Sequence, residues 1–165
     1  MARPRDDQLL VPSVLDRLLD DEPGVSREAP RSRGQVLRAL KLSVRRDLEN
    51  LLNSRSRCRS WPLEMTELKQ SLVNYGVPDI TGASFGTPED REDFCRTLEQ
   101  VIRRHETRFR SVTVTLLENT ESLDRILRFR IDALLKVEPA PEPVVFDSSL
   151  RLADADFEVR GGTDE

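Results

Sequence analysis

The residue types best suited to acid–base chemistry occur together in one short segment. His105, Glu106 and Arg108 lie within RHETRF, at residues 104–109. A carboxylate beside basic side chains could transfer protons, or it could form charge-assisted hydrogen bonds. A general acid must hold its proton, however, and neighbouring basic groups stabilise the ionised carboxylate instead. Glu106 is the best single candidate for acid–base work, but its neighbours favour an ion pair that ties a helix end to a neighbouring element, or a local surface pair of small worth.

Other kinds of reactive or ligand-binding site find little support. The single histidine cannot supply a multi-histidine metal site, and Cys58 and Cys95 form no CxxC pair. The sequence has no GxxxxGK[ST] or GxGxxG phosphate loop, and no serine stands in a nucleophile-elbow context. We therefore expect no catalytic residue, no metal, no cofactor and no disulfide framework.

Length and composition limit the remaining classes. The chain has 165 residues and a net charge of -4, which suits one ordinary domain with tails. Apolar runs do not exceed about four residues, far short of a membrane-spanning helix. The N-terminus also lacks the apolar core of a signal peptide. These features predict a cytoplasmic protein with no direct membrane insertion.

Positive charge is concentrated in one stretch and is carried mostly by arginine. Residues 31–60 contain nine basic and two acidic residues, a sum of +7. Such a stretch could bind nucleic acid, and it could equally solvate a helix face or meet an acidic protein surface. The chain is acidic overall and Trp61 is the only aromatic residue nearby for base stacking, so we favour the second interpretation and expect no nucleic-acid partner.

The elements that position these residues change in period along the chain. Helical spacing of apolar residues predicts helices over about residues 13–21, over 35–53, over 65–75, and from the Thr87 cap onward. Ser13 and Asp16 would form a capping box in the first helix. This helix is too short to be stable alone, so its apolar stripe must dock on its own domain or on a partner. The stripe consists of Val14, Leu15, Leu18 and Leu19.

A period of two replaces the helical period after residue 110. Alternation predicts strands over residues 111–117 and 123–137, and two more over 144–152 and 156–160. In the second strand, Arg128 and Arg130 should face away from the core. The expected fold is α+β, with N-terminal helices followed by a small antiparallel sheet of three or four strands. We expect residues 1–30 to form a tail with a short partner-docking helix, 31–160 a single domain, and 161–165 a disordered tail.

Four segments together resemble a known family. They are VPSVLDRLLDDEP (11–23), SVRRDLENLLNSR (43–55), ELKQSLVNYGVPDITG (67–82) and RHETRF (104–109). In series they resemble the TssE family of type VI secretion baseplate subunits, which is related to a small wedge subunit of contractile phage baseplates. RHETRF is similar to the family's Glu-Pro-Arg motif, with Thr107 in place of proline. Glu106 and Arg108 keep both charged positions.

The resemblance implies a structural baseplate part without catalytic activity. Similar proteins sit in cytoplasmic baseplate wedges, at the inner membrane, with TssF, TssG and TssK, and they join the baseplate to the sheath made of TssB and TssC. The resemblance also implies nucleation of sheath assembly by strand addition to an exposed sheet edge, with outward-facing arginine on the edge strands. Interface roles are implied for Glu106, Arg108, Arg128, Arg130 and the N-terminal helix. Some members are labelled lysozyme-like, so a peptidoglycan-cleaving enzyme is the alternative.

Overall fold

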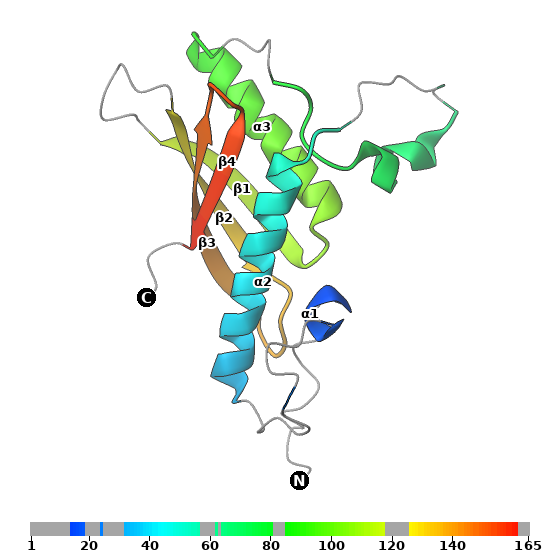
Figure 1. Ribbon diagram of the computed structural model, residues 1–165, viewed down its shortest axis with the longest axis vertical. Coiled ribbons are helices and arrows are strands. Elements are labelled where there is room, and N and C mark those ends of the chain that lie inside the picture. The colour runs from blue at the N-terminus through cyan, green and yellow to red at the C-terminus, as the bar shows by residue number, and fades with distance from the viewer. Residues whose placement is uncertain are drawn as a thin grey trace.

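The element order confirms the predicted α+β class. The computed structural model describes residues 14–18, 24, 32–56, 62, 64–80, 85–117 and 126–161. The helical elements come first in the chain and the strands follow (Figure 1). The helical elements are α1 (Val14–Leu18), α2 (Arg33–Asn53), the 3₁₀ turns η1 (Thr66–Gln70) and η2 (Leu72–Asn74), and α3 (Pro88–His105). The strands are β1 (Phe109–Leu117), β2 (Ile126–Leu135), β3 (Glu142–Arg151) and β4 (Asp156–Gly161).

Capping boxes begin the two long helices. In α2 the Ser32 hydroxyl accepts a hydrogen bond from the Gln35 amide, and the Gln35 side chain accepts one from the Ser32 amide. Thr87 and Asp90 form the same arrangement in α3, with Pro88 in the first turn. These contacts satisfy amide groups that the first helical turn leaves unpaired. The Thr87 cap is therefore confirmed, and α2 begins two residues before its predicted start.

The strands form one antiparallel sheet in the order β1-β2-β3-β4. Strands β1 and β4 are therefore its edges. Strand β2 alternates buried and exposed residues along its length, so its apolar side chains face the core as predicted. Arg128 and Arg130 are exposed on its other face, and Arg130 lies opposite Asp147 of β3. Because β2 is central, these two arginines do not lie on an edge strand, which corrects that expectation.

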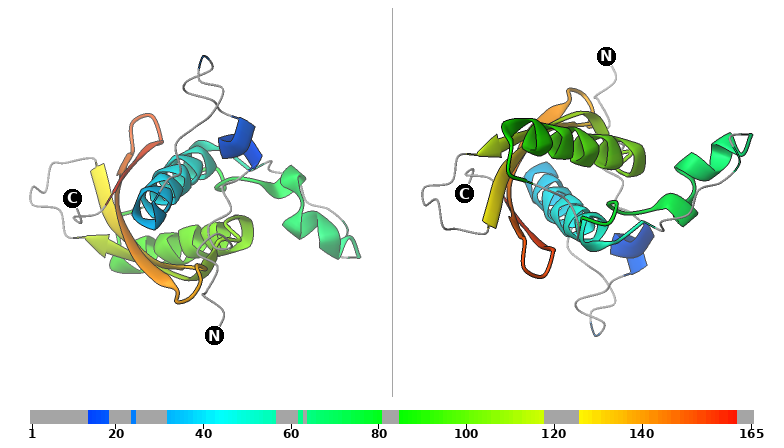
Figure 2. Two further views of the ribbon diagram at one scale, coloured as in Figure 1. Left: turned by 90° about the horizontal axis from the view of Figure 1, so that it is seen from below. Right: turned by 90° about the horizontal axis from the view of Figure 1, so that it is seen from above.

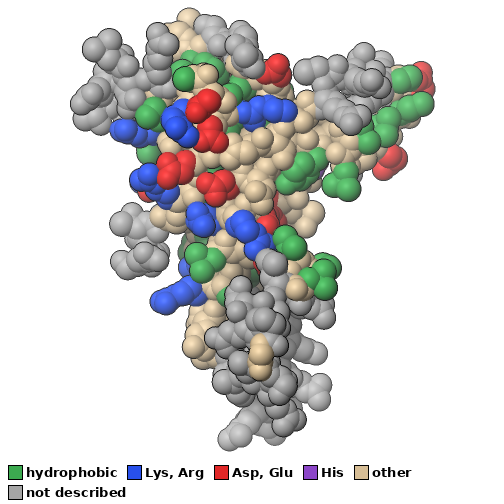
Figure 3. All heavy atoms as spheres, in the orientation of Figure 1, with side chains coloured by type: hydrophobic (Ala, Val, Ile, Leu, Met, Phe, Trp, Pro, Cys, Tyr) green, Lys and Arg blue, Asp and Glu red, His purple; other side chains and the backbone are tan. Residues whose placement is uncertain are grey.

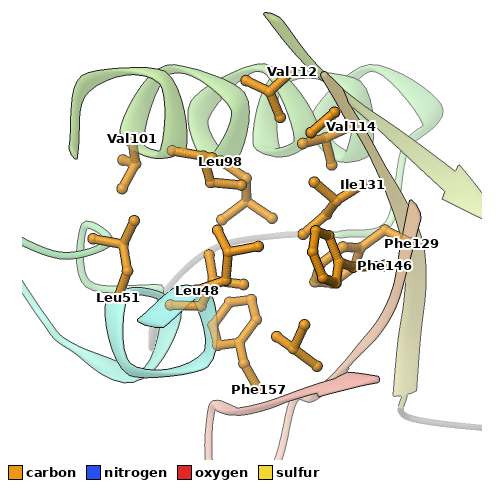
Figure 4. Packing of buried hydrophobic residues seen from close by; sticks show 14 of the residues in the cluster. Leu48, Leu51, Leu98, Val101, Val112, Val114, Phe129, Ile131, Phe146 and Phe157 are labelled. Atoms are coloured by element: carbon orange, nitrogen blue, oxygen red, sulfur yellow. The ribbon is translucent and has the colours of Figure 1, made fainter. Parts of the chain in front are cut away.

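The sheet curves around the two long helices. Figure 2 shows α2 and α3 on its concave side, with α3 beside β1 and α2 beside β4. Apolar side chains from both helices and all four strands meet between these layers (Figure 4). Leu48 of α2, Leu98 of α3 and Phe129 of β2 are fully buried there. The stripes predicted for α2 and α3 thus supply the core.

The helix predicted over residues 65–75 is wrong. The chain instead forms η1 and η2, and Ser71 between them has an extended backbone, with φ -82° and ψ 163°. Leu72 is 85 % exposed. The segment projects from the main body in Figures 1 and 2, so packing against the core does not stabilise a continuous helix there.

A glycine fixes the return of this segment to the core. Gly76 has φ +107°, and a Cβ atom at this position would lie 2.5 Å from the Ser54 carbonyl oxygen. The close approach allows Val77 and Ser54 to pair, with the Val77 amide donating to the Ser54 oxygen at 2.8 Å. Val77 is fully buried as a result.

Among the described residues, no helix has the length and apolar character needed to cross a membrane.

Candidate functional site: a carboxylate–arginine cluster

Glu106 and Arg108 lie in the turn between α3 and β1. Glu106 caps the C-terminus of α3, and its amide donates to the Ile102 oxygen at 2.8 Å. The Phe109 amide donates to the Glu106 oxygen at 3.3 Å, which closes a turn with Thr107 at its second position. The Lys136 amide donates to the Arg108 oxygen at 2.8 Å. Backbone hydrogen bonds therefore fix the turn at both ends.

The two side chains form a bidentate ion pair. Arg108 Nε donates to Glu106 Oε1 at 2.7 Å, and Arg108 Nη2 donates to Oε2 at 2.5 Å. The Arg108 amide also donates to Oε1, at 3.0 Å. Glu106 is only 7 % exposed, so water screens this pair little. The interpretation of a surface pair of small worth is thus wrong for Glu106.

Arg108 extends the contacts to α2. Its Nη2 donates to Asp47 Oδ2 at 2.7 Å, and its Nη1 donates to Ser43 Oγ at 3.3 Å. Residues 43 and 47 are one helical turn apart, so both face the same side of α2. The guanidinium thereby joins the α3–β1 turn to the middle of α2.

Asp16 carries the same network on to α1. Ser43 Oγ donates to Asp16 Oδ2 at 2.5 Å, and Arg46 Nη2 donates to Asp16 Oδ1 at 2.7 Å. Arg46 also pairs with Asp47 at 3.1 Å. We call Asp16, Ser43, Arg46, Asp47, Glu106 and Arg108 the carboxylate–arginine cluster. Asp16 thus binds α2, and the capping partner predicted for it, Ser13, lies outside the described residues.

The apolar side chains of α1 remain at the surface. Val14 is 74 % exposed, Leu15 50 % and Leu18 76 %. Leu19, the fourth predicted member of the stripe, lies outside the described residues. In Figure 3, hydrophobic side chains gather near α1 and on the projecting η1–η2 segment, on the same face of the molecule. Helix α1 is therefore held by a polar side chain while its described apolar side chains face outward.

The charges of the cluster are nearly balanced. Three carboxylates and two guanidinium groups leave one net negative charge. Burial disfavours the charged form of Arg108, but hydrogen bonds and charges from Glu106 and Asp47 outweigh it and raise the pKa of the guanidinium. The hydrogen bond to Asp16 likewise raises the pKa of Arg46. Both arginines therefore stay charged under all physiological conditions.

A pocket of about 430 Å³ lies against the cluster. Its lining includes Asp47, Glu106 and Arg108 of the cluster, together with Tyr75 and His105. The Tyr75 and His105 rings make an edge-on contact, with centroids 5.1 Å apart. Burial lowers the pKa of His105 from its ordinary value, and its Nε2 atom is buried without a hydrogen-bond partner among the described residues. The pocket lining thus combines charged side chains with two aromatic rings.

This geometry does not support acid catalysis by Glu106. Both of its carboxylate oxygens accept hydrogen bonds from Arg108, so the carboxylate is engaged within the protein and is not free to contact a substrate. Among the described residues, no group of three or more His, Cys, Asp or Glu side chains could hold a metal ion. The arrangement can instead connect three elements and present a shaped, charged surface.

The other predicted site residues lie apart from the cluster. Arg130 pairs with Asp147 at 3.1 Å on the outer face of the sheet, and Arg128 is exposed on the same face. In the basic segment, several side chains have partners within the protein. Lys41 pairs with Glu142, Arg33 donates to the Glu138 oxygen, and Arg46 belongs to the cluster. The sequence did not identify Ser43 and Asp47 as members of the site. The signal that it carries for them is their one-turn spacing, which places both on the same face of α2.

Comparisons with known proteins identify a family and a similar solved structure. Residues 38–140 match the family described as "Baseplate wedge protein gp25". A chain in the solved structure "The baseplate complex from the type VI secretion system" is 22 % identical, with a TM-score of 0.47. The match covers 67 % of this chain and 93 % of that one. No curated protein matches the chain.

Proposed function

The chain belongs to the baseplate wedge protein gp25 family, and we propose that it is the structural wedge subunit that links a type VI secretion baseplate to its contractile sheath. The family match over residues 38–140 is the observation that carries this proposal. The matched region includes most of α2, all of α3, β1 and β2, and the Glu106–Arg108 pair. A structural role also accords with the engaged carboxylate of Glu106.

The cluster and α1 form the proposed docking surface for the other wedge subunits. Val14, Leu15 and Leu18 expose apolar area that a partner could bury, at about 25 cal/mol per Å² removed from water. Glu106 is buried, so it acts by positioning Arg108 and α2 rather than by direct contact. The expected wedge partners are TssF, TssG and TssK. In this proposal the region around α1 binds the wedge, and the elements from α2 to β4 form the body that carries it.

The sheet provides the proposed link to the sheath subunits TssB and TssC. An extended segment of a sheath subunit would add to an edge strand, so that backbone hydrogen bonds supply affinity. Arg128 and Arg130 lie on the outer face of the sheet, where they would set selectivity rather than supply most of the affinity. The proposed location is the cytoplasmic side of the inner membrane, within the assembled baseplate.

Co-purification separates the two proposed surfaces. We expect the wild-type chain to bind the TssF–TssG wedge subunits and, separately, TssB–TssC. Leu15→Asp and Leu18→Asp change exposed side chains, so both variants should fold but lose wedge binding. Val145→Asp is the matched control, because Val145 is exposed on the outer face of β3. Unchanged wedge binding by the two α1 variants would contradict the docking role, and binding to neither protein set would contradict the proposed function.

A further inference from the structure

Both edges of the sheet are occupied by side chains of the neighbouring helices. At the β4 edge, the Asn53 amide pairs with both backbone groups of Phe157, at 2.8 and 2.9 Å. The next residue along that edge is Val159. Its carbonyl accepts from Arg45 at 3.1 Å, and its amide donates to Glu49 at 3.4 Å. Residues 45, 49 and 53 are spaced one turn apart on α2, so one face of this helix caps the edge.

Side chains of helix α3 cap the β1 edge in a similar way. Arg103 Nη2 donates to the Val112 carbonyl at 3.2 Å, and the Val114 amide donates to Glu99 Oε2 at 3.4 Å. Residues 99 and 103 lie one turn apart on α3, as residues 45 and 49 do on α2. We call Glu99 and Arg103 the β1 cap, and Arg45, Glu49 and Asn53 the β4 cap.

We propose that the β1 cap is the one that opens, so that an extended segment of the sheath subunit pairs with β1 in place of Arg103 and Glu99. This inference rests on the proposed link to the sheath and specifies its edge. A guanidinium donor and a carboxylate acceptor occupy the places of an N–H and a C=O group of an added strand. Strand addition would therefore exchange one set of hydrogen bonds for another, at little net cost.

The hydrogen bonds favour opening at β1 rather than β4. The β4 cap engages both backbone groups of Phe157 and of Val159, at 2.8 to 3.4 Å. The β1 cap engages one group each of Val112 and Val114, at 3.2 and 3.4 Å. Glu99 Oε1 also pairs with Arg103 at 2.6 Å within α3. These two side chains can therefore satisfy each other after they leave the strand.

The solvent-facing side chains of the two edge strands also favour strand addition at β1. Strand β4 exposes Glu158 and Arg160, which pair at 2.8 Å, and such charges discourage a further strand. Strand β1 exposes Arg110 at its start, and beyond it the exposed residues Ser111, Thr113 and Thr115 are uncharged. The two threonines also favour extended structure. It has nine residues against six in β4, so it offers more backbone groups for pairing.

Residue-resolved amide hydrogen exchange tests the edge. On addition of TssB–TssC to the full chain, we expect the amide of Val114 to become more protected and those of Phe157 and Val159 to stay unchanged. New protection at Phe157 and Val159 would overturn the choice of β1. Binding without new protection at either edge would overturn strand addition itself while leaving the sheath link intact. Absence of binding would overturn the sheath link, and with it this inference.

A pair of double variants tests the cap. Glu99→Ala with Arg103→Ala should raise exchange of the Val114 amide and tighten TssB–TssC binding, each by about tenfold, because two modest hydrogen bonds no longer oppose opening. Glu92→Ala with Arg96→Ala removes an equivalent pair on the exposed face of α3, at 3.1 Å, and should change neither quantity. Equal behaviour of the two double variants would overturn the capping role. Weaker binding by the first would also overturn it, since the side chains would then contact the sheath directly.

Discussion

At the scale of single residues, burial decides what the Glu106–Arg108 pair does. The spacing of the two charges and their place between a helix and a strand could be predicted from the sequence, and so could their pairing. Their partners could not, because Asp47 and Ser43 lie about sixty residues away along the chain and reach Arg108 only after α2 has docked. The pair is therefore first a connection within the protein, and its proposed effect on partners passes through the elements it holds.

Arg108→Ala should destabilise the protein strongly. Removal of the guanidinium leaves the buried Glu106 carboxylate unpaired, which should lower the free energy of unfolding by about 3 kcal/mol. Arg130→Ala is the control, because its partner Asp147 is 39 % exposed and the loss should stay below about 1 kcal/mol. Urea denaturation of both variants provides the measurement. Similar losses in the two variants would contradict the buried role of the pair.

Thr107→Pro should stabilise the turn. Thr107 stands second in the turn closed by the Phe109 amide and the Glu106 oxygen, a position that proline favours. Glu106 before it has a non-helical backbone, with φ -99° and ψ 87°, which avoids the region that a following proline disfavours. We expect the free energy of unfolding to rise by about 0.5–1 kcal/mol, because the unfolded chain loses freedom. A fall in the midpoint temperature of thermal unfolding would show that the turn does not accommodate the proline ring.

At the scale of elements, hydrophobic periodicity correctly predicted the elements that pack against the core. The apolar stripe of α3 and the alternation in β2 both identify their buried faces, because each element packs along its whole length. The stripe over residues 65–75 failed, since this segment projects and its backbone follows local turns. The edge caps show another limit. Glu99 and Asn53 look like ordinary surface residues in the sequence, and only the position of each helix beside an edge strand gives them partners.

Gly76→Ala should test how the projecting segment is joined to the core. The new methyl group would lie 2.5 Å from the Ser54 oxygen, at a φ that only glycine adopts readily, so we expect a loss of about 1–3 kcal/mol. Gly34→Ala is the control, because no atom lies within 4 Å of its added Cβ in α2. That variant should be neutral or gain up to about 1 kcal/mol. Chemical denaturation compares them, and an equal response would contradict the steric argument.

At the scale of the whole molecule, polar contacts connect parts that apolar packing leaves separate. The carboxylate–arginine cluster runs from the start of β1 through the middle of α2 to α1, while the apolar core joins the helices to the sheet. The sheath and wedge surfaces proposed above lie on different parts of this body. The cluster connects α1 to the sheet-bearing body through Asp16, so changes at Asp16 should separate wedge docking from folding of the body.

Asp16→Ala should release α1 while the body stays folded. The substitution removes the acceptor for Ser43 and Arg46, and a five-residue helix is far too short to persist without such an anchor. We expect faster amide exchange in α1, a loss of about 1–2 kcal/mol in unfolding free energy, and weaker binding to the wedge subunits with TssB–TssC binding retained. Asp93→Ala is the control, because Asp93 is 73 % exposed and pairs with Arg96 on the surface of α3. If Asp16→Ala bound the wedge subunits as tightly as Asp93→Ala, α1 would not need its anchor to dock, and the polar connection would serve stability alone.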